Sequence, residues 1–312
     1  MGNQYVGFGK ESSSYGAYAA PTSFLEIISE SLKLERAYDP IETFRSYSTR
    51  DMVLLNSIVR GDMEILANYQ GLNFLFLYLL GSADYTTGGG NTHTFPASTG
   101  IPATDRIGLS LSATVRRDTS LYWRYTGLKP ISFGHQFGID AAQRMTVGWV
   151  GKTETTSTTG TTATYPSLLP MDPADASINF SGGSALPATS VQITVENPVD
   201  ELYVLGSTTI AREPVRNGVL KCTFSADIVF EDFTSFYDYF DGTTTLDTQI
   251  VSTNGTESLT YNFDSCRILQ ATPAVSGRDR LVATVEGESF YTSDAVENMQ
   301  VIAINSDTTS EV

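Results

Sequence analysis

Two stretches of the chain alternate between apolar and polar residues with a period of two. Apolar or small residues occupy alternate positions from Val59 to Ala67 and again from Leu220 to Ile228. Arg60, Asp62 and Glu64 occupy the intervening positions of the first stretch. This period is typical of a strand with one face on a core and one face in water. The pattern therefore predicts two half-buried strands in the middle of two similar segments.

After each predicted strand the apolar spacing becomes helical. The first helix carries Leu72, Leu75, Phe76 and Leu79, and the second carries Phe233, Phe236, Tyr237 and Phe240. Gly81 and Gly242 follow, where a glycine commonly ends a helix. The first helix is apolar on nearly all sides, so we expect a deep cover over it. Its leucines and Phe76 are therefore candidates for contact with a neighbouring subunit.

The two segments belong to a longer internal repeat. The stretch 56–81 aligns without a gap with 217–242, and 31–42, 121–132 and 144–152 have counterparts at 190–201, 259–270 and 280–288. Four matches in the same order favour a tandem duplication. The alternative is that two β-domains share generic strand patterning.

The remaining patterns predict further strands in both halves. The ranges are 30–37, 107–117, 121–133 and 144–154, then 190–196, 202–212, 246–252, 258–270 and 279–291. The expected fold is mainly β, with two tandem β-sandwich domains that each carry one flanking α-helix. The predicted limits are an N-terminal arm (1–28), a first domain (29–155), a linker rich in Thr, Gly, Ser and Pro (156–189), a second domain (190–305) and a C-terminal tail (306–312).

Composition narrows the range of functions. The 312 residues carry a formal net charge of −16, which disfavours binding to nucleic acid phosphates or anionic membranes. The longest apolar run, Phe74 to Leu80, is too short to span a bilayer, and the first ten residues do not read as a signal peptide.

Candidate chemistry is sparse. His93 lies in a polar loop and His135 in a predicted turn, and we interpret both as structural. Cys222 and Cys266 are interpreted as buried thiols. Asp62 and Glu64 share a strand face and resemble a carboxylate pair, but the second segment has Thr223 and Ser225 there. The Gly88 triplet lacks the lysine of a phosphate-binding loop. We expect no catalytic, cofactor or metal site, and no enzyme.

The N-terminal half contains a motif with a known likeness. Gly9, Glu11, Tyr15 and Gly16 form a G-x-E-x-x-x-Y-G pattern, Gly61-Asp62 opens a strand, and a helix ends at Leu80-Gly81. This combination resembles the major tail tube proteins of long-tailed bacteriophages. The likeness covers most of the first half and extends less strongly to the second, which has Cys222-Thr223 in place of glycine and aspartate.

The resemblance implies a fold and an assembly. Tail tube domains form six-membered rings that stack into a hollow tube, through which genomic DNA passes without specific binding. A duplicated chain would complete a pseudo-sixfold ring as a trimer. The resemblance also implies tape-measure, tail-tip and terminator proteins as partners, assembly in the host cytoplasm, a place in the virion tail, and no membrane.

Within this assembly the sequence offers candidate contact residues. Asp62, Glu64 and Asp227 are candidates for the lumen, where an acidic surface repels DNA. Two loops are candidates for contact between rings. Their residues are Asp39, Pro40 and Glu42 in the first loop and Asn197, Pro198 and Asp200 in the second.

Two other classes of protein remain open. A capsid decoration or receptor-binding protein also suits tandem sandwiches with Thr-rich loops, but it would not stack without limit. A lectin or carbohydrate-active enzyme would need exposed aromatic residues beside paired carboxylates, whereas Trp123 and Trp149 both lie in apolar strand patterns.

Overall fold

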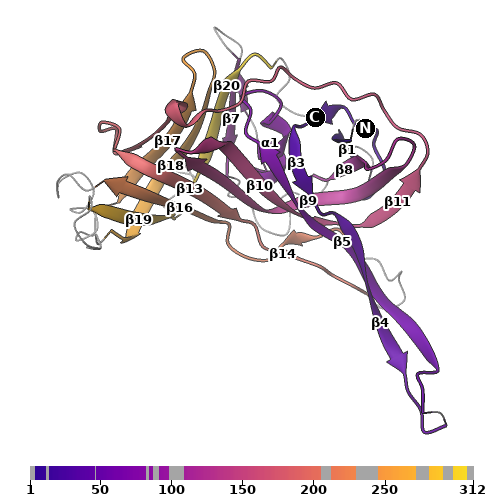
Figure 1. Ribbon diagram of the computed structural model, residues 1–312. Coiled ribbons are helices and arrows are strands. Elements are labelled where there is room, and N and C mark those ends of the chain that lie inside the picture. Colours follow the sequence, from indigo (N-terminus) through magenta and orange to yellow (C-terminus); the bar gives the residue numbers. More distant parts are fainter. Residues whose placement is uncertain are drawn as a thin grey trace.

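The computed structural model of the chain describes residues 4–11, 14–45, 47–81, 84–86, 91–97, 109–204, 212–229, 245–271, 281–290 and 298–307. Figure 1 shows a body built from antiparallel strands, with one long two-stranded arm extending away from it. The expectation of a mainly β chain is therefore confirmed.

The central sheet contains two groups of four strand positions in the same order. In the first group, β3 (Ile27–Glu30) and β4 (Lys33–Ile41) pair with β5 (Asp51–Leu66), β5 with β10 (Ala141–Gly151), and β10 with β9 (Tyr122–Gly138). In the second group, β13 (Ala188–Glu196) pairs with β16 (Lys221–Val229), β16 with β19 (Val282–Ser289), and β19 with β18 (Ser258–Gln270). Every pairing is antiparallel.

The two groups are joined edge to edge. β9 pairs with β13 over seven positions, from Ser132 opposite Glu196 to Gly138 opposite Ser190. One continuous sheet therefore runs from β3 to β18 through both halves of the chain. The apolar faces of both groups also contribute to a single core that includes Phe133, Ile193 and Tyr261. The two predicted domains thus share a sheet and a core.

Two outer layers cover the apolar face of this sheet. The first contains β1 (Tyr5–Lys10), β2 (Ser23–Phe24), β8 (Leu111–Arg116), the N-terminal part of β9, and β11 (Thr153–Ser157). The second contains β12 (Ala176–Phe180), β17 (Leu246–Thr253), the N-terminal part of β18, β20 (Gln300–Asn305), β7 (Asn91–Pro96) and β6 (Asp84–Thr86). β7 therefore comes from the first half and completes the outer layer of the second.

The first predicted helix is confirmed as α1 (Asn73–Leu80), which ends at Gly81 with a φ of 95°. All eight residues are buried within the chain. The ring of Phe76 lies 5.9 Å from that of Phe95, 5.8 Å from that of Phe133 and 6.1 Å from that of Tyr261, measured between centroids. The expected deep cover thus comes from the chain itself, and Leu72, Leu75, Phe76 and Leu79 have almost no exposed surface left for a neighbouring subunit. The second predicted helix lies outside the described residues.

The N-terminal segment differs from the predicted arm because β1 is buried between β2 and β8. The motif glutamate explains why. The Glu11 carboxylate is only 3% exposed, and it accepts hydrogen bonds from the backbone N–H groups of Gly16 and Gly127 and from the hydroxyls of Ser110 and Ser112, all at 2.7–2.8 Å. Gly16 has a φ of +80°, which favours glycine. The motif therefore fixes the N-terminal segment to the body.

The segment predicted to be a linker also contains regular structure. The one-turn helix η1 (Pro173–Asp175) leads into β12, which pairs with β17 along its whole length. The exact limits of the two predicted domains remain a prediction. In the part of the chain that the structure describes, no helix has both the length and the apolar character needed to cross a membrane.

Candidate functional site

One face of the central sheet is polar across both halves. The strand registers align a row of small or polar residues from one end to the other: Glu64 on β5, Thr146 on β10, Gly134 on β9, Thr194 on β13, Thr223 on β16 and Glu288 on β19. Side chains two residues apart on a strand share a face. Asp62 and Glu64 therefore lie on the same face as Asp227, although they belong to different halves. We call this surface the polar face.

The polar face carries more acidic than basic side chains. Among its described residues outside the arm, six carboxylates accompany five basic groups: Asp62, Glu64, Glu196, Asp227, Glu286 and Glu288, with Lys33, Arg60, Arg144, Lys221 and Arg267. The remaining positions are filled mainly by Ser, Thr, Gln and Gly. The face is therefore polar, with charges of both signs and a small excess of carboxylates.

The three predicted acidic residues have different surroundings. Glu64 forms an ion pair with Arg144 at 2.8 Å. Asp227 is half-buried and accepts hydrogen bonds from Ser190 Oγ at 2.8 Å and Thr284 Oγ1 at 2.7 Å. Asp62 is exposed, and its backbone, rather than its carboxylate, bonds to Ser31. Among the described contacts, Glu64 and Asp227 each have a side-chain partner for the carboxylate, whereas the Asp62 carboxylate has none.

The first predicted loop is the end of a projecting hairpin. β4 and the first part of β5 continue their pairing far from the body, and we call residues 35–56 the arm (Figure 1). Asp39, Pro40 and Glu42 are exposed on it. Large apolar side chains are exposed there too: Tyr38, Ile41, Phe44, Tyr47, Met52, Val53 and Leu55. Such a concentration on a monomer is typical of an interaction surface.

The second predicted loop lies against the body. Asn197 is 2% exposed; its side-chain amide donates to Pro130 O at 3.0 Å and its Oδ1 accepts from Arg216 Nε at 3.1 Å. Pro198 and Asp200 are exposed beside it. β14 (Val199–Asp200) and β15 (Val215–Arg216) form a short separate pair. Asn197 is therefore committed to contacts within the chain and is removed from the candidate ring contacts.

The histidines and cysteines have structural surroundings. Both histidines lie inside strands, His93 on β7 and His135 on β9, so the predicted loop and turn at these positions are wrong. Their apolar strand neighbours draw them into the core. His135 Nδ1 lies 2.9 Å from the Tyr261 hydroxyl, and burial lowers the pKa of His135 to about 3. Cys222 and Cys266 are buried free thiols, and burial raises the pKa of Cys266 to about 12.

Several residues of the polar face were missed by sequence reasoning. Glu196, Glu286 and Glu288 alternate with buried residues on β13 and β19, so the same period-two pattern would have found them. Their position on the same sheet face as Glu64 follows only from the pairing of β9 with β13, for which the sequence carries no local signal. Among the described residues, no group of three or more His, Cys, Asp or Glu side chains is arranged to hold a metal ion.

A two-layer β body, a polar sheet face and an exposed apolar arm are features of a structural protein. A family model described as phage tail tube protein matches residues 2–289, and the chain belongs to this family. No curated protein gives a significant match. The chain is therefore a structural component of a phage tail.

Proposed function

We propose that three copies of this chain form a ring and that rings stack into the hollow tube through which phage DNA leaves the capsid. The observation that carries this proposal is the repeated strand order. β3-β5-β10-β9 and β13-β16-β19-β18 are two equivalent sheet units, consistent with an internal duplication. Two units per chain and six units per ring give a trimer. Closing the sheets into a barrel also removes their exposed edges.

The polar face lines the lumen in this arrangement. Its excess of carboxylates, including Asp62, Glu64 and Asp227, repels the DNA backbone, and its few basic groups leave little counterion release to favour binding. DNA can then slide past the wall without being held. The apolar faces of the sheets remain covered by the outer layers.

The arm supplies the contact between rings. Its apolar side chains have no cover in the single chain, and a neighbouring ring would bury them. Asp39, Pro40 and Glu42 lie at this contact, and Pro198 and Asp200, exposed at the base of the second hairpin, are further candidates for it. The remaining proposed partners are the tape-measure, tail-tip and terminator proteins, with assembly in the host cytoplasm.

Electron microscopy of the purified chain tests the proposal, with mass photometry at the same concentrations. We expect hollow tubes of stacked rings, and a soluble species of three chain masses. Rings of six chains would retain the function but contradict the two-unit trimer. A monomer or a closed oligomer that never stacks would contradict the tube and favour a capsid decoration or receptor-binding protein.

The lumen is tested by reversing charge on the polar face. Tubes of an Asp62→Lys, Glu64→Lys variant should retain short double-stranded DNA at low salt, whereas native tubes should not. Asp118→Lys, Asp247→Lys, with both changes at exposed positions of the outer layers, is the control for the same change in net charge. Equal DNA retention by the two variants would place Asp62 and Glu64 outside the lumen.

A further inference from the structure

The continuous sheet has two free edges in the single chain. At one end lie β3 and the start of β4, which pair only with β5 among the described strands. At the other end lies the C-terminal part of β18. Its pairing with β17 ends at Cys266, so, among the strands that the structure describes, β19 is the one that pairs with residues from Arg267 to Gln270. The two ends of the sheet are thus strands of opposite units.

The pairing of β9 with β13 inside the chain is a template for how the free edges of two neighbouring chains could pair. Ser31 of the first unit is equivalent to Thr194 of the second, because each lies opposite the matching position of the next strand, Asp62 or Thr223. The alignment by sequence, which pairs Ser31 with Ser190, is therefore four residues out of register on this strand. By the same registers, Gln270 is equivalent to Gly134. Thr194 and Gly134 lie directly opposite each other where β13 meets β9. A copy of this junction between chains would therefore place Gln270 opposite Ser31.

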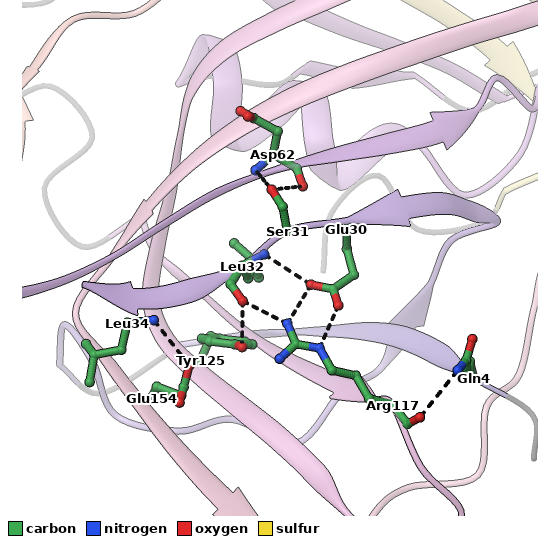
Figure 2. A network of polar contacts seen from close by, with 9 residues as sticks. All are labelled: Gln4, Glu30, Ser31, Leu32, Leu34, Asp62, Arg117, Tyr125 and Glu154. Carbon is green, nitrogen blue, oxygen red and sulfur yellow. Dashed lines mark hydrogen bonds and ion pairs between the residues drawn. The ribbon is translucent and has the colours of Figure 1, made fainter.

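Side chains occupy the free edge at the break between β3 and β4 (Figure 2). The Leu32 N–H donates to Glu30 Oε2 at 3.1 Å, and the Leu32 carbonyl accepts from Arg117 Nη2 at 2.7 Å and from the Tyr125 hydroxyl at 2.9 Å. The equivalent residue of the second unit is Val195, which instead lies opposite Phe133 in the ladder between β13 and β9. At Leu32, side chains therefore form the hydrogen bonds of the free edge. At the equivalent Val195, the neighbouring strand β9 occupies that edge.

The charged pair at this edge is held firmly. Arg117 Nε and Nη2 donate to Glu30 Oε1 and Oε2 at 2.7 and 2.8 Å, a bidentate arrangement. The Arg117 guanidinium also lies 5.0 Å from the centre of the Trp123 ring. Charged side chains at a free edge are a common protection against unwanted strand pairing. The side chains of Arg117 and Glu30 are 32% and 16% exposed, so an incoming strand can reach the pair.

We propose that the Glu30–Arg117 pair is a latch over the β3 edge, and that it opens when the β18 edge of a second copy of this chain adds to that edge in the register of the β9–β13 junction. The inference rests on the proposed ring. The incoming strand replaces the side-chain hydrogen bonds at Leu32 with backbone ones, while Arg117 remains stacked on Trp123. The latch keeps free chains from pairing at random edges before a ring can close.

Cysteine cross-linking tests the edge pairing in tubes assembled from the full chain. In an antiparallel ladder, the Cα atoms of a non-hydrogen-bonded pair of opposite residues are about 4.5 Å apart, and this distance suits a disulfide. A Ser31→Cys, Gln270→Cys variant should give covalent trimers on mild oxidation. Ser31→Cys with Arg267→Cys, two positions out of register, should give few. The native Cys222 and Cys266 are buried and serve as the common background.

The latch is tested by the concentration at which assembly begins. Arg117→Gln and Glu30→Gln should each lower that concentration by about threefold or more, because the cost of opening the pair is removed. Arg116→Gln, whose guanidinium bonds to the backbone of the adjacent turn, should leave it unchanged. Thermal unfolding of each variant checks that the body remains folded.

The outcomes separate this inference from the proposed function. Tubes without a cross-link between residues 31 and 270 would overturn the edge pairing but keep the tube. Cross-linked trimers, with an onset concentration for both latch variants equal to or above that of the native chain, would overturn the latch. A chain that forms neither rings nor tubes would overturn the proposed function and this inference with it.

Discussion

The two halves use an equivalent hairpin in opposite ways. By the strand registers, residues 34–59 of the first half correspond to 197–220 of the second, so the hairpins are similar in length. The first continues its ladder outward as the arm (Figure 1), and Phe44 and Tyr47 are exposed on it. The second leaves its ladder at Asn197, and its described ends lie against the body. The same position in the sheet thus provides one free arm and one hairpin whose described ends are attached to the body.

The residues at the base of each hairpin explain the difference. Leu34 and Glu35 continue the first ladder into the arm. Their counterparts are Asn197 and Pro198, and proline has no N–H to donate to a ladder. The second hairpin is then fixed by Lys129, whose Nζ bonds to Glu213 Oε1 at 2.8 Å and to the Pro214 carbonyl at 3.0 Å. A hairpin that finds cover in its own chain stabilises the body, whereas one that does not must find cover in another molecule.

Removing the apolar end of the arm should have the largest effect. A Phe44→Ser, Tyr47→Ser variant should need a roughly tenfold or higher concentration to form tubes, because aromatic anchors contribute most of the energy of an interface. Its melting temperature should stay unchanged, because neither side chain is covered in the single chain. Val219→Ser, which removes an exposed apolar group from the second hairpin, is the control. Equal onset concentrations for the two variants would show that the hairpins do not differ in assembly.

Breaking the buried ion pair should affect the second hairpin instead. Lys129→Met leaves the Glu213 carboxylate without its ammonium partner, so the free energy of unfolding should fall by about 2 kcal/mol in chemical denaturation. Arg60→Gln removes the more exposed pair with Glu201 and should cost less than about 1 kcal/mol. Cleavage of the Lys129→Met variant by a protease should also increase within 200–216. If Lys129→Met lowered the free energy of unfolding no more than Arg60→Gln, this would contradict the role of Lys129 in fixing the second hairpin.

The hydrogen bonds of Asn197 should have a smaller effect in the same direction. Asn197→Ala removes one bond to Pro130 and one to Arg216, and about 1–2 kcal/mol of unfolding free energy should be lost. Asp200→Ala, exposed three residues further on, should change it by less than about 0.5 kcal/mol. Amide exchange at Val215 and Arg216 should increase only in the Asn197 variant. Unchanged exchange there would mean that Asn197 does not hold the hairpin.

Local patterns predicted the elements that alternation or helical spacing encodes. β5, β16 and α1 follow from Val59–Ala67, Leu220–Ile228 and the leucines before Gly81. β1 was missed because Gly7 and Gly9 interrupt its apolar pattern, where a Cβ would lie 2.6 Å from the Phe24 ring and 2.3 Å from the Ala20 carbonyl oxygen. Pro198 indicates a break in the second ladder, but Pro40 lies within the first ladder, so the prolines alone could not predict the different positions of the two hairpins. They depend on contacts of Asn197 and Lys129 with residues 67 and 84 positions away in sequence.

Acidification should give the smallest of these effects, a loss of stability that involves the second hairpin and not the arm. His135 lies in the core below the β9–β13 junction, against Phe137 and the Tyr261 hydroxyl. Because burial lowers its pKa from 6.5 to about 3, the unfolded chain binds a proton below pH 6.5 that the folded chain does not. Stability is therefore fully present above pH 6.5 and is lost as the pH falls, by roughly 1 kcal/mol between pH 7.5 and 5.5.

The measurement is the unfolding free energy of the native chain and of His135→Phe over that range. The variant should lose less stability on acidification, since it lacks this titrating group, and His93 and the carboxylates are common to both proteins. The protection factor for amide exchange, which corrects for the intrinsic pH dependence of the rate, should fall with acid at Val199 in the native chain, because β14 follows the strand that pairs with His135, and it should not change along the exposed arm. Parallel pH curves for the two proteins would rule out His135 as the titrating group, and equal acceleration in the arm would contradict the different support of the two hairpins.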